Sequence, residues 1–438
     1  MKILVTGLCT LHWGRLEYGN VGNYYIVEPL FRELHRVFPD AEIMTTFQMT
    51  EDFKRKEAIT CLPMEWYYSW TEDDLQNAKN EYEIAKKYTN AIPSECLTDW
   101  LKCIRDMDLV LDVSGDMWGD NAEHVGHDRF LVDLYKMRAA QLMGKKTVLF
   151  AVTPGPFHDN STKTFAQEVF SGFSLVENRE PTSTQNMEDW GFDISKVMDF
   201  ACPAFLYTPS LPAEELALLK SDNPILYTER NKPICGFTIG GFNLPVGPYD
   251  MWPRDNEQYT VFVQAIEHII NTQNMKVVLF SHTNGFELPP NFRLINGRDY
   301  CILEQLRDIV RQRGLITDPD SLSIIEKPYP PAQLKTLIKH FDMLVTGRVH
   351  ASVAGISQYV PTVFINYEKS FIPSTKMFGF ADLAGVREYV CDPADKDELI
   401  RKIDLCAENR ISIEERLRVN IPIVQQKAQA GFDQLIKL

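Results

Sequence analysis

Arg348 and His350 stand where an apolar run gives way to a run of small residues. The mixture of aromatic, branched and long apolar side chains over 341–346 predicts a buried strand, and the small residues over 349–356 predict a helix. The strand would turn at Gly347 directly into the helix. A turn of this kind leaves the first N–H groups of the helix unpaired, and these groups attract anions. A cation in the first turn opposes the helix dipole by about 0.3–1 kcal/mol. The pattern therefore predicts a phosphate or carboxylate ligand. The alternative is an Arg348 that turns to solvent and a His350 packed in the core.

The loop 114–128 holds more acids and histidines than any other short stretch of the chain. Asp116 or Asp120 could accept a hydrogen bond from a substrate hydroxyl and act as its general base. Together with these acids, His124 and His127 could also supply metal ligands. Their spacing matches no standard ligand set, so we predict no metal and interpret the acids as candidate bases.

Two further segments place polar groups at strand ends. A strand over 2–6 leads into a glycine-rich loop containing Asn20 and Gly22, and a helix follows over 24–36. A strand, a glycine-rich loop and a helix bring backbone N–H groups near a ligand, although the spacing is not that of a dinucleotide fingerprint. Arg179 follows another short strand and can bind a carboxylate or phosphate with two hydrogen bonds. Its alternative role is a surface ion pair.

An aromatic cluster, Trp66, Tyr67, Tyr68 and Trp70, lies in a stretch that otherwise predicts helix over 50–102. Such rings can stack on sugars, but they serve equally well in the packing of a core. Both interpretations stay open from the sequence.

The order of elements indicates an α/β protein with two domains. Strands alternate with helices up to about residue 200, and the pattern restarts at a strand over 234–239 followed by a turn with Gly240 and Gly241. Repeated alternation implies parallel sheets covered by helices, with ligands beyond the carboxyl ends of the strands. We expect an N-terminal Rossmann-like domain over 1–205 and a linker over 206–232. We expect a C-terminal Rossmann-like domain over 233–394, then helices over 395–438.

Composition excludes several classes of protein. With 438 residues, 45% of them hydrophobic and 24% charged, the chain is globular and long enough for two cores. A formal net charge of −15 argues against a nucleic-acid partner. The nine cysteines form no Cys-x-x-Cys pair, and we see no signal peptide and no transmembrane segment. We therefore expect a reduced, cytoplasmic protein without structural zinc.

The chain resembles the polysaccharide pyruvyltransferase family from about residue 2 to about residue 385. The main resemblance is an Arg-x-His-Ala helix start at Arg348, a Val-Pro-led strand after it, and a Tyr-x-x-Lys-like segment with Tyr367 and Lys369. The loop over 19–23, the Gly-Pro turn over 153–156 and the Asn-Arg-Glu segment around Arg179 follow the family order. The departures from the family pattern are Asn23, Glu180 and Cys202, each where the family has Asp, and Ser114-Gly115-Asp116 in place of a glycine-rich turn.

The resemblance implies a glycosyltransferase B-like fold with two Rossmann-like domains and an active site in the interdomain cleft. It also implies that the N-terminal domain lies on the acceptor side, that the C-terminal domain lies on the donor side, and that the helices over 395–438 brace the first domain. It implies transfer of a pyruvyl group from phosphoenolpyruvate to sugar hydroxyls, with no cofactor beyond this donor substrate. Arg348 and Arg179 would bind phosphate and carboxylate, and His350 would be the general acid. The other expected substrate-binding residues are Asn20, Gly22, Gly240, Gly241, Tyr367 and Lys369.

Two rival hypotheses remain from the sequence. The first is a glycosyltransferase that holds the diphosphate of a nucleotide sugar at the same helix start. The second is a noncatalytic family member that binds glycans through the aromatic cluster. The acceptor would be a sugar or glycan, free or lipid-linked, and the oligomeric state is not predicted.

Overall fold

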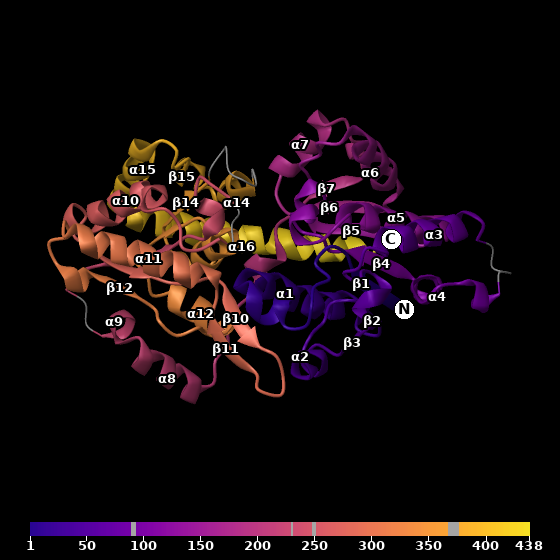
Figure 1. Cartoon of the computed structure of the whole chain (residues 1–438), viewed down its shortest axis with the longest axis horizontal. Coiled ribbons are helices and arrows are strands. Elements are labelled where there is room, and N and C mark those ends of the chain that lie inside the picture. Colours follow the sequence, from indigo (N-terminus) through magenta and orange to yellow (C-terminus); the bar gives the residue numbers. More distant parts are fainter. Residues whose placement is uncertain (89–92, 229–230, 248–250, 367–375) are drawn as a thin grey trace. The chain divides into compact units, whose positions relative to one another are not determined.

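The computed structural model describes residues 1–88, 93–228, 231–247, 251–366 and 376–438. The chain forms two compact units, each with its own sheet (Figure 1). Unit 1 comprises Met1–Leu16, Val27–Pro203 and Lys427–Leu438, and unit 2 comprises Glu17–Ile26 and Ala204–Gln426. Each unit therefore contains a segment that is distant in sequence from its main part.

Unit 1 is built on seven parallel strands in the order β3-β2-β1-β4-β5-β6-β7. The strands are β1 (Lys2–Thr6), β2 (Glu42–Thr45), β3 (Ile59–Cys61), β4 (Leu109–Asp112), β5 (Lys146–Val152), β6 (Leu175–Asn178) and β7 (Val197–Asp199). Its helices are α1 (Val21–Val37, which starts in unit 2), α2 (Glu51–Lys56), α3 (Asp74–Lys86), α4 (Asp99–Asp106), α5 (Arg129–Leu142), α6 (Asn160–Gly172) and α7 (Thr182–Asp189). The order changes direction between β1 and β4, which is a topological switch point.

Unit 2 has a second parallel sheet, of six strands in the order β12-β9-β8-β13-β14-β15. These strands are β8 (Ile234–Thr238), β9 (Lys276–Leu279), β12 (Leu322–Ile324), β13 (Met343–Thr346), β14 (Thr362–Ile365) and β15 (Val390–Cys391), and an antiparallel hairpin of β10 (Asn284–Glu287) and β11 (Arg293–Asn296) is inserted after β9. The helices are α8 (Ala213–Asp222), α9 (Pro224–Tyr227), α10 (Thr260–Asn271), α11 (Arg298–Arg313), α12 (Pro331–Ile338), α13 (Val349–Ile356), α14 (Lys376–Ala384), α15 (Lys396–Glu408) and α16 (Arg410–Leu435). Here the switch point lies between β8 and β13.

The described structure confirms the α/β alternation and corrects several details. The stretch 206–232, expected to be an irregular linker, contains α8 and α9 and is part of unit 2. The stretch 50–102, expected to be helical, also contains the short edge strand β3. Three-residue strands carry too little periodicity to be recognised, because their pairing with β2 rather than their own pattern determines them.

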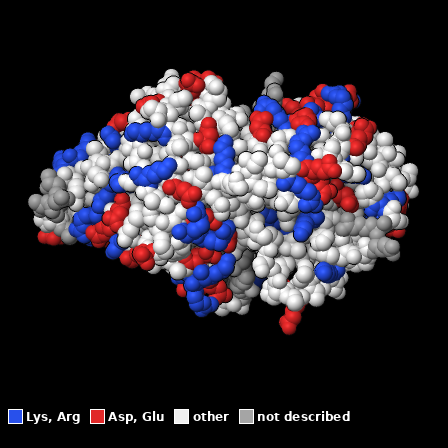
Figure 2. Space-filling model, turned by 180° about the vertical axis from the view of Figure 1, so that it is seen from behind, with Lys and Arg blue, Asp and Glu red and all other residues white. Residues whose placement is uncertain are grey.

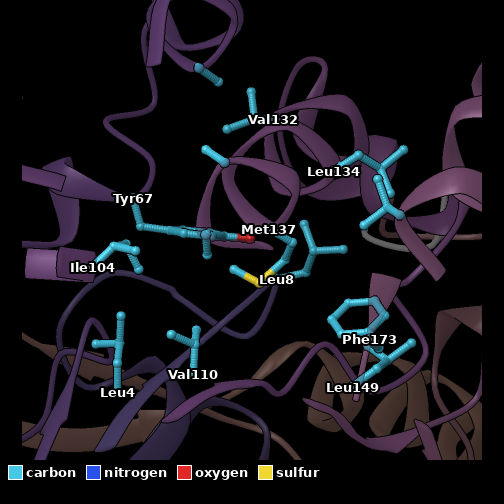
Figure 3. Close-up of a cluster of buried hydrophobic side chains, with 14 of the residues drawn as sticks. Leu4, Leu8, Tyr67, Ile104, Val110, Val132, Leu134, Met137, Leu149 and Phe173 are labelled. Carbon is cyan, nitrogen blue, oxygen red and sulfur yellow. The ribbon is translucent and has the colours of Figure 1, made fainter. Parts of the chain in front are cut away.

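Unit 1 has a hydrophobic core made from the sheet and the helices over it. Leu4, Val110 and Leu149 come from three neighbouring strands, and Met137 comes from α5 (Figure 3). Tyr67, from the aromatic cluster, is 1% exposed and belongs to the same core. Burial of such side chains contributes roughly 25 cal/mol per Å² of apolar surface, and this term dominates the stability of the unit.

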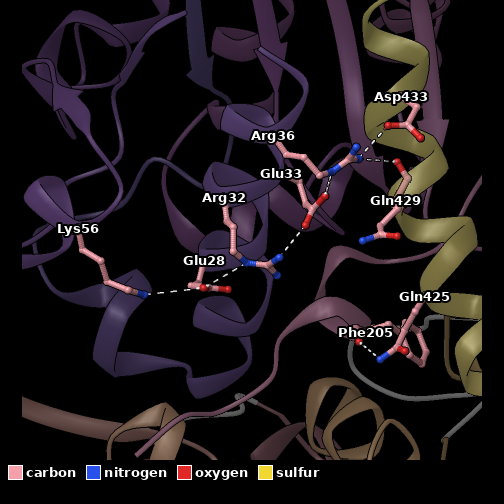
Figure 4. A network of polar contacts seen from close by, with 9 residues as sticks. All are labelled: Glu28, Arg32, Glu33, Arg36, Lys56, Phe205, Gln425, Gln429 and Asp433. Carbon is pink, nitrogen blue, oxygen red and sulfur yellow. Dashed lines mark hydrogen bonds and ion pairs between the residues drawn. The ribbon is translucent and has the colours of Figure 1, made fainter. Parts of the chain in front are cut away.

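The last residues of α16 attach to unit 1 through polar contacts with α1. Arg36 donates to Asp433 at 2.8 Å and pairs with Glu33 of its own helix (Figure 4). Within unit 2, Gln425 donates to the main-chain oxygen of Phe205 at 3.0 Å. The single helix α16 therefore makes contacts in both units.

Charges of both signs mix on the face that Figure 2 shows, where basic side chains lie among acidic ones and wide areas carry neither. In the described part of the chain, every helix is too short or too polar to pass through a lipid bilayer.

Unit 1 also buries an acid that lacks a partner. Glu177 of β6 is fully buried, and neither carboxyl oxygen is hydrogen-bonded among the described residues. A Cβ atom added at Gly431 of α16 would come within 2.3 Å of Oε1, so only a glycine can pack there. Burial raises the pKa of Glu177 well above its ordinary value, because the charged form would lose its hydration.

We expect Glu177→Gln to flatten the pH dependence of stability. The unfolded chain ionises near pH 4.5 whereas the folded chain stays protonated, so the wild type loses up to about 1.4 kcal/mol of unfolding free energy per pH unit above that point. Melting temperatures measured from pH 5 to pH 8 should fall less in the variant. The exposed Glu65→Gln serves as control and should follow the wild type. A parallel fall in Glu177→Gln would contradict the prediction.

Candidate functional site

The switch point of unit 2 brings two loops together. β13 pairs with β8 so that Thr346 lies opposite Thr238, and both strands end there. The loop after β8 contains Gly240, and the loop after β13 contains Arg348. Ligands of open α/β sheets bind beyond the carboxyl ends at such a point. The predicted residues therefore lie where the fold favours a ligand site.

Arg348 immediately precedes α13, and Asp299 fixes its side chain. Its Nε donates to Oδ2 of Asp299 at 2.9 Å, and its Nη2 donates to Oδ1. The Arg348 side chain is 13% exposed, whereas that of Asp299 is fully buried. The solvent-facing alternative is thus wrong. Asp299 escaped the sequence analysis because it lies 49 residues from its partner, in the first turn of α11.

Gly240 has a structural reason to be a glycine. A Cβ atom there would lie 2.5 Å from Nη2 of Arg348 and 2.7 Å from Oδ1 of Asp299. Its N–H donates to Oδ1 of Asn243 at 2.9 Å, and the amide of Asn243 donates to the main-chain oxygen of Gly347 at 3.1 Å. Asn243 thus ties the two loops together, and Gly241 begins the short turn Gly241–Asn243 between them.

His350 lies in the first turn of α13, against the first turn of α1. A Cβ atom at Gly22 would be 2.4 Å from Cβ and 2.9 Å from Nδ1 of His350. Asn20 accepts the N–H of Gly22 at 3.1 Å and forms an isolated antiparallel bridge with Thr283. Asn20 and Gly22, predicted separately from Arg348 and His350, therefore lie in the same unit and next to the same elements.

His282 also belongs to this region and was missed by the sequence analysis. It is 1% exposed, and within the described chain neither ring nitrogen has a hydrogen-bond partner. Its main-chain oxygen accepts the N–H of Val21 at 3.3 Å. Burial, then Arg348 and His350, lower the pKa of His282 well below its ordinary value, so the imidazole is neutral at pH 7. The available signal was a polar residue three positions after the end of β9.

The arrangement in unit 2 can bind an anion. The first-turn N–H groups of α13 have no acceptor within the helix, and the helix dipole adds a partial positive charge. Among the described residues, Nη1 of Arg348 makes no hydrogen bond, while the other two nitrogens of the group are bound to Asp299. The N–H groups of Val21 and Gly22 at the start of α1 already have acceptors. The donors for a ligand therefore come chiefly from α13 and its flanking side chains.

Arg179 and Asp116 lie in unit 1, at the carboxyl ends of its strands. Arg179 is 2% exposed and donates from Nε to the hydroxyl of Thr153 at 2.7 Å, which excludes the surface ion pair. A Cβ atom at Gly115 would be 3.8 Å from Nη1 of Arg179 and 3.9 Å from the sulfur of Cys9. Burial, then Asp116, raise the pKa of the Cys9 thiol to about 12. The thiol is thus protonated and unreactive at neutral pH.

Asp120 lies in the same region but has a structural contact. Its Oδ2 accepts the N–H of His158 at 2.5 Å, and its own N–H donates to the main-chain oxygen of Pro156 at 2.9 Å. These two bonds join the loop after β4 to the loop after β5. Both acids lie at the carboxyl ends of the strands of unit 1 and remain candidate bases.

A buried pair of acids lies behind this loop. Asp112 ends β4 and Asp133 lies in α5, and both are fully buried. The hydroxyl of Tyr67 donates to Asp133 at 2.6 Å, and Ser114 donates to Asp112. Burial, then the charge of Asp133, raise the pKa of Asp112 well above its ordinary value. Burial therefore favours the neutral form of Asp112, and the sequence showed only an apolar strand ending in an acid.

The aromatic cluster is mainly structural. Tyr67 and Tyr68 are 1% and 2% exposed. Trp70 is partly buried, stacks on His12 with ring centroids 4.7 Å apart, and lies 4.8 Å from the guanidinium of Arg129. These contacts favour the packing interpretation over a platform for sugars.

Two of the predicted substrate-binding residues, Tyr367 and Lys369, lie outside the described residues. In the described ranges, no group of three His, Cys, Asp or Glu side chains is placed to hold a metal ion.

Known proteins resemble this chain in sequence and in fold. The curated amylovoran biosynthesis protein AmsJ of Erwinia amylovora is 23% identical over 439 residues, which cover 95% of this chain and 94% of AmsJ. Among solved structures, UDP-GlcNAc 2-epimerase of Neisseria meningitidis has a TM-score of 0.59 at 12% identity and covers 100% of both chains. A glycosyltransferase of Rickettsia africae has a TM-score of 0.57 at 14% identity, covering 100% of this chain and 98% of its own.

These structures share the glycosyltransferase B-like α/β fold with this protein, in agreement with the two parallel sheets. The model of the family described as polysaccharide pyruvyl transferase matches residues 20–369, which include both switch-point loops of unit 2, after β8 and after β13. The chain belongs to the polysaccharide pyruvyl transferase family, whose members are transferases of polysaccharide biosynthesis.

Proposed function

We propose that the protein transfers a pyruvyl group from phosphoenolpyruvate to two hydroxyls of a sugar and forms a cyclic ketal. The observation that supports this most directly is the placement of Arg348, His350 and the start of α13 at the switch point of unit 2. The donor carries a phosphate and a carboxylate, which such a set of donors recognises. No resident cofactor is needed for this reaction.

The reaction assigns a task to each group. A proton adds to the methylene carbon of the donor, and positive charge develops at the neighbouring carbon. One sugar hydroxyl attacks that carbon and loses its proton, the C–O bond to phosphate breaks, and the second hydroxyl then attacks in the same way. The two hydroxyl protons leave through a base and the departing phosphate. We assign the acid role to His350 and the base role to Asp116 or Asp120.

The remaining residues supply binding. Arg348, pinned by Asp299, would hold the donor phosphate through its Nη1 edge. Arg179 would bind a carboxylate or a sugar oxygen at the strand ends of unit 1. The similarity to AmsJ supports a glycan acceptor made during polysaccharide biosynthesis. We propose a cytoplasmic reaction, since phosphoenolpyruvate is a cytoplasmic metabolite.

Ligand-dependent melting separates this proposal from a nucleotide-sugar transferase. We expect phosphoenolpyruvate to raise the melting temperature. At a concentration a hundred times its dissociation constant, the ligand should add about 2.7 kcal/mol to the unfolding free energy. UDP-glucose should leave the melting temperature unchanged. Arg348→Ala should abolish the shift, whereas the exposed Arg401→Ala, in the same unit, should retain it. A shift with UDP-glucose alone would favour the rival transferase and contradict the proposal.

Activity should depend on Arg348 as strongly as binding does. Arg348→Ala is expected to reduce pyruvyl transfer at least 100-fold, because a transition-state phosphate loses a charged donor worth about 2.7–4 kcal/mol. The measurement is the release of phosphate in the presence of glycan acceptors isolated from the organism that makes this protein. Circular dichroism checks that the variant is folded. Wild-type turnover in a folded Arg348→Ala variant would refute the assignment.

Gly22→Ala tests the contact between α1 and α13. The added methyl would overlap the side chain of His350, which must then shift away from its place. We expect weaker phosphoenolpyruvate binding, by about tenfold, with a small fall in melting temperature. Asn23→Ala, at the next position, adds no atom and should bind normally. Unchanged affinity in Gly22→Ala would show that the place of His350 does not matter for the donor.

A further inference from the structure

We propose that Asp299 is a positioning residue for the anion site: it orients the guanidinium of Arg348 and sets the net charge that a ligand meets. This inference rests on the proposed function only where it names phosphoenolpyruvate as the anion. The geometry of the pair stands without it.

The main hydrogen-bond partner of the Asp299 carboxylate is the guanidinium of Arg348. Asp299 is fully buried, and its two oxygens accept from Nε and Nη2 of Arg348. Its own N–H donates to the hydroxyl of Thr283 at 3.2 Å. A buried carboxylate without a cation would be strongly destabilising, so the two side chains are kept together by the cost of separating them.

The pair fixes which edge of Arg348 a ligand can use. Asp299 occupies the edge formed by Nε and Nη2, and the backbone of Gly240 packs so closely on this edge that a Cβ atom would overlap both side chains. The ring centroid of Phe242 lies 5.7 Å from the guanidinium carbon. A planar group held on several sides cannot rotate to follow an anion. Only a ligand that places its oxygens in line with the N–H bonds of Nη1 gains the full interaction.

The pair also changes the charge of the site. Arg348 and Asp299 together are neutral, so the attraction for a simple anion falls to α13 and to the remaining nitrogen of the guanidinium. Removal of the carboxylate should therefore have two opposite effects. It leaves a net positive charge, which attracts any anion more strongly, and it frees the guanidinium, which then distinguishes anions less well.

Calorimetric titration of the full chain with phosphoenolpyruvate and with inorganic phosphate tests this prediction. In Asp299→Asn we expect inorganic phosphate to bind several-fold more tightly, while the preference for phosphoenolpyruvate over phosphate falls at least fivefold. In an Arg348→Lys background, which keeps the positive charge but not the planar guanidinium, Asp299→Asn should still strengthen phosphate binding but leave the preference unchanged, because Asp299 sets the preference through the guanidinium. A merely structural role would lower stability in both backgrounds and leave the preference unchanged.

Glu81→Gln is the matched control. Glu81 and Lys136 form a buried ion pair at 2.5 Å in unit 1, with side chains 6% and 5% exposed. Its loss should lower the melting temperature without altering affinity for either anion. If Asp299→Asn does not fold, Asp299→Glu replaces it, and the longer carboxylate should shift the preference while keeping the net charge.

The outcomes separate the two hypotheses. Failure of phosphoenolpyruvate to bind the wild type would overturn the proposed donor, while tighter phosphate binding by Asp299→Asn would still support the role of Asp299. Unchanged phosphate affinity and an unchanged preference in a folded Asp299→Asn variant would overturn that role. An equal fall in the preference on Asp299→Asn in the wild type and in the Arg348→Lys background would overturn it as well.

Discussion

The pairing of β13 with β8 is the constraint on which the rest of unit 2 depends. Because the hydrogen-bonded ladder sets Thr346 opposite Thr238, the loops after both strands begin at the same level of the sheet. The neighbouring crossovers run in opposite directions from this point, which is where ligands of open α/β sheets usually bind. Arg348, Gly240 and Asn243 occupy the loops beside this gap, and Asn243 bridges them.

Sequence patterns predicted the strands and the general place of the site, and for a physical reason. Buried parallel strands are continuous apolar runs, so β1, β5 and β13 were visible, and a cation directly after such a strand was conspicuous. The pattern could not predict contacts between residues that are far apart in the sequence. Asp299 and His282 have ordinary local surroundings, and only the folded chain brings them to Arg348.

The weakest sequence predictions concerned elements that depend on neighbours. The strand β3 has three residues and the hairpin of β10 and β11 is an insertion, so neither contributes a run long enough to recognise. Asp120 looked like a candidate general base by residue type, yet its carboxylate joins two loops through the N–H of His158. Residue type determines which chemistry a side chain is capable of. Its hydrogen bonds in the folded chain determine whether the side chain is available for that chemistry.

The division of the chain has a practical consequence for protein engineering. Unit 2 contains residues 17–26 as well as its long C-terminal part, and these few residues bring Asn20 to Thr283 and Gly22 to His350. A fragment that starts at residue 204 would therefore lack the residues that pack on His350 and pair with Thr283. Because unit 2 is made of two separate segments of the chain, its exchange between relatives requires four junctions. A chimera joined at one point near residue 204 would combine α13 from one parent with the start of α1 from another.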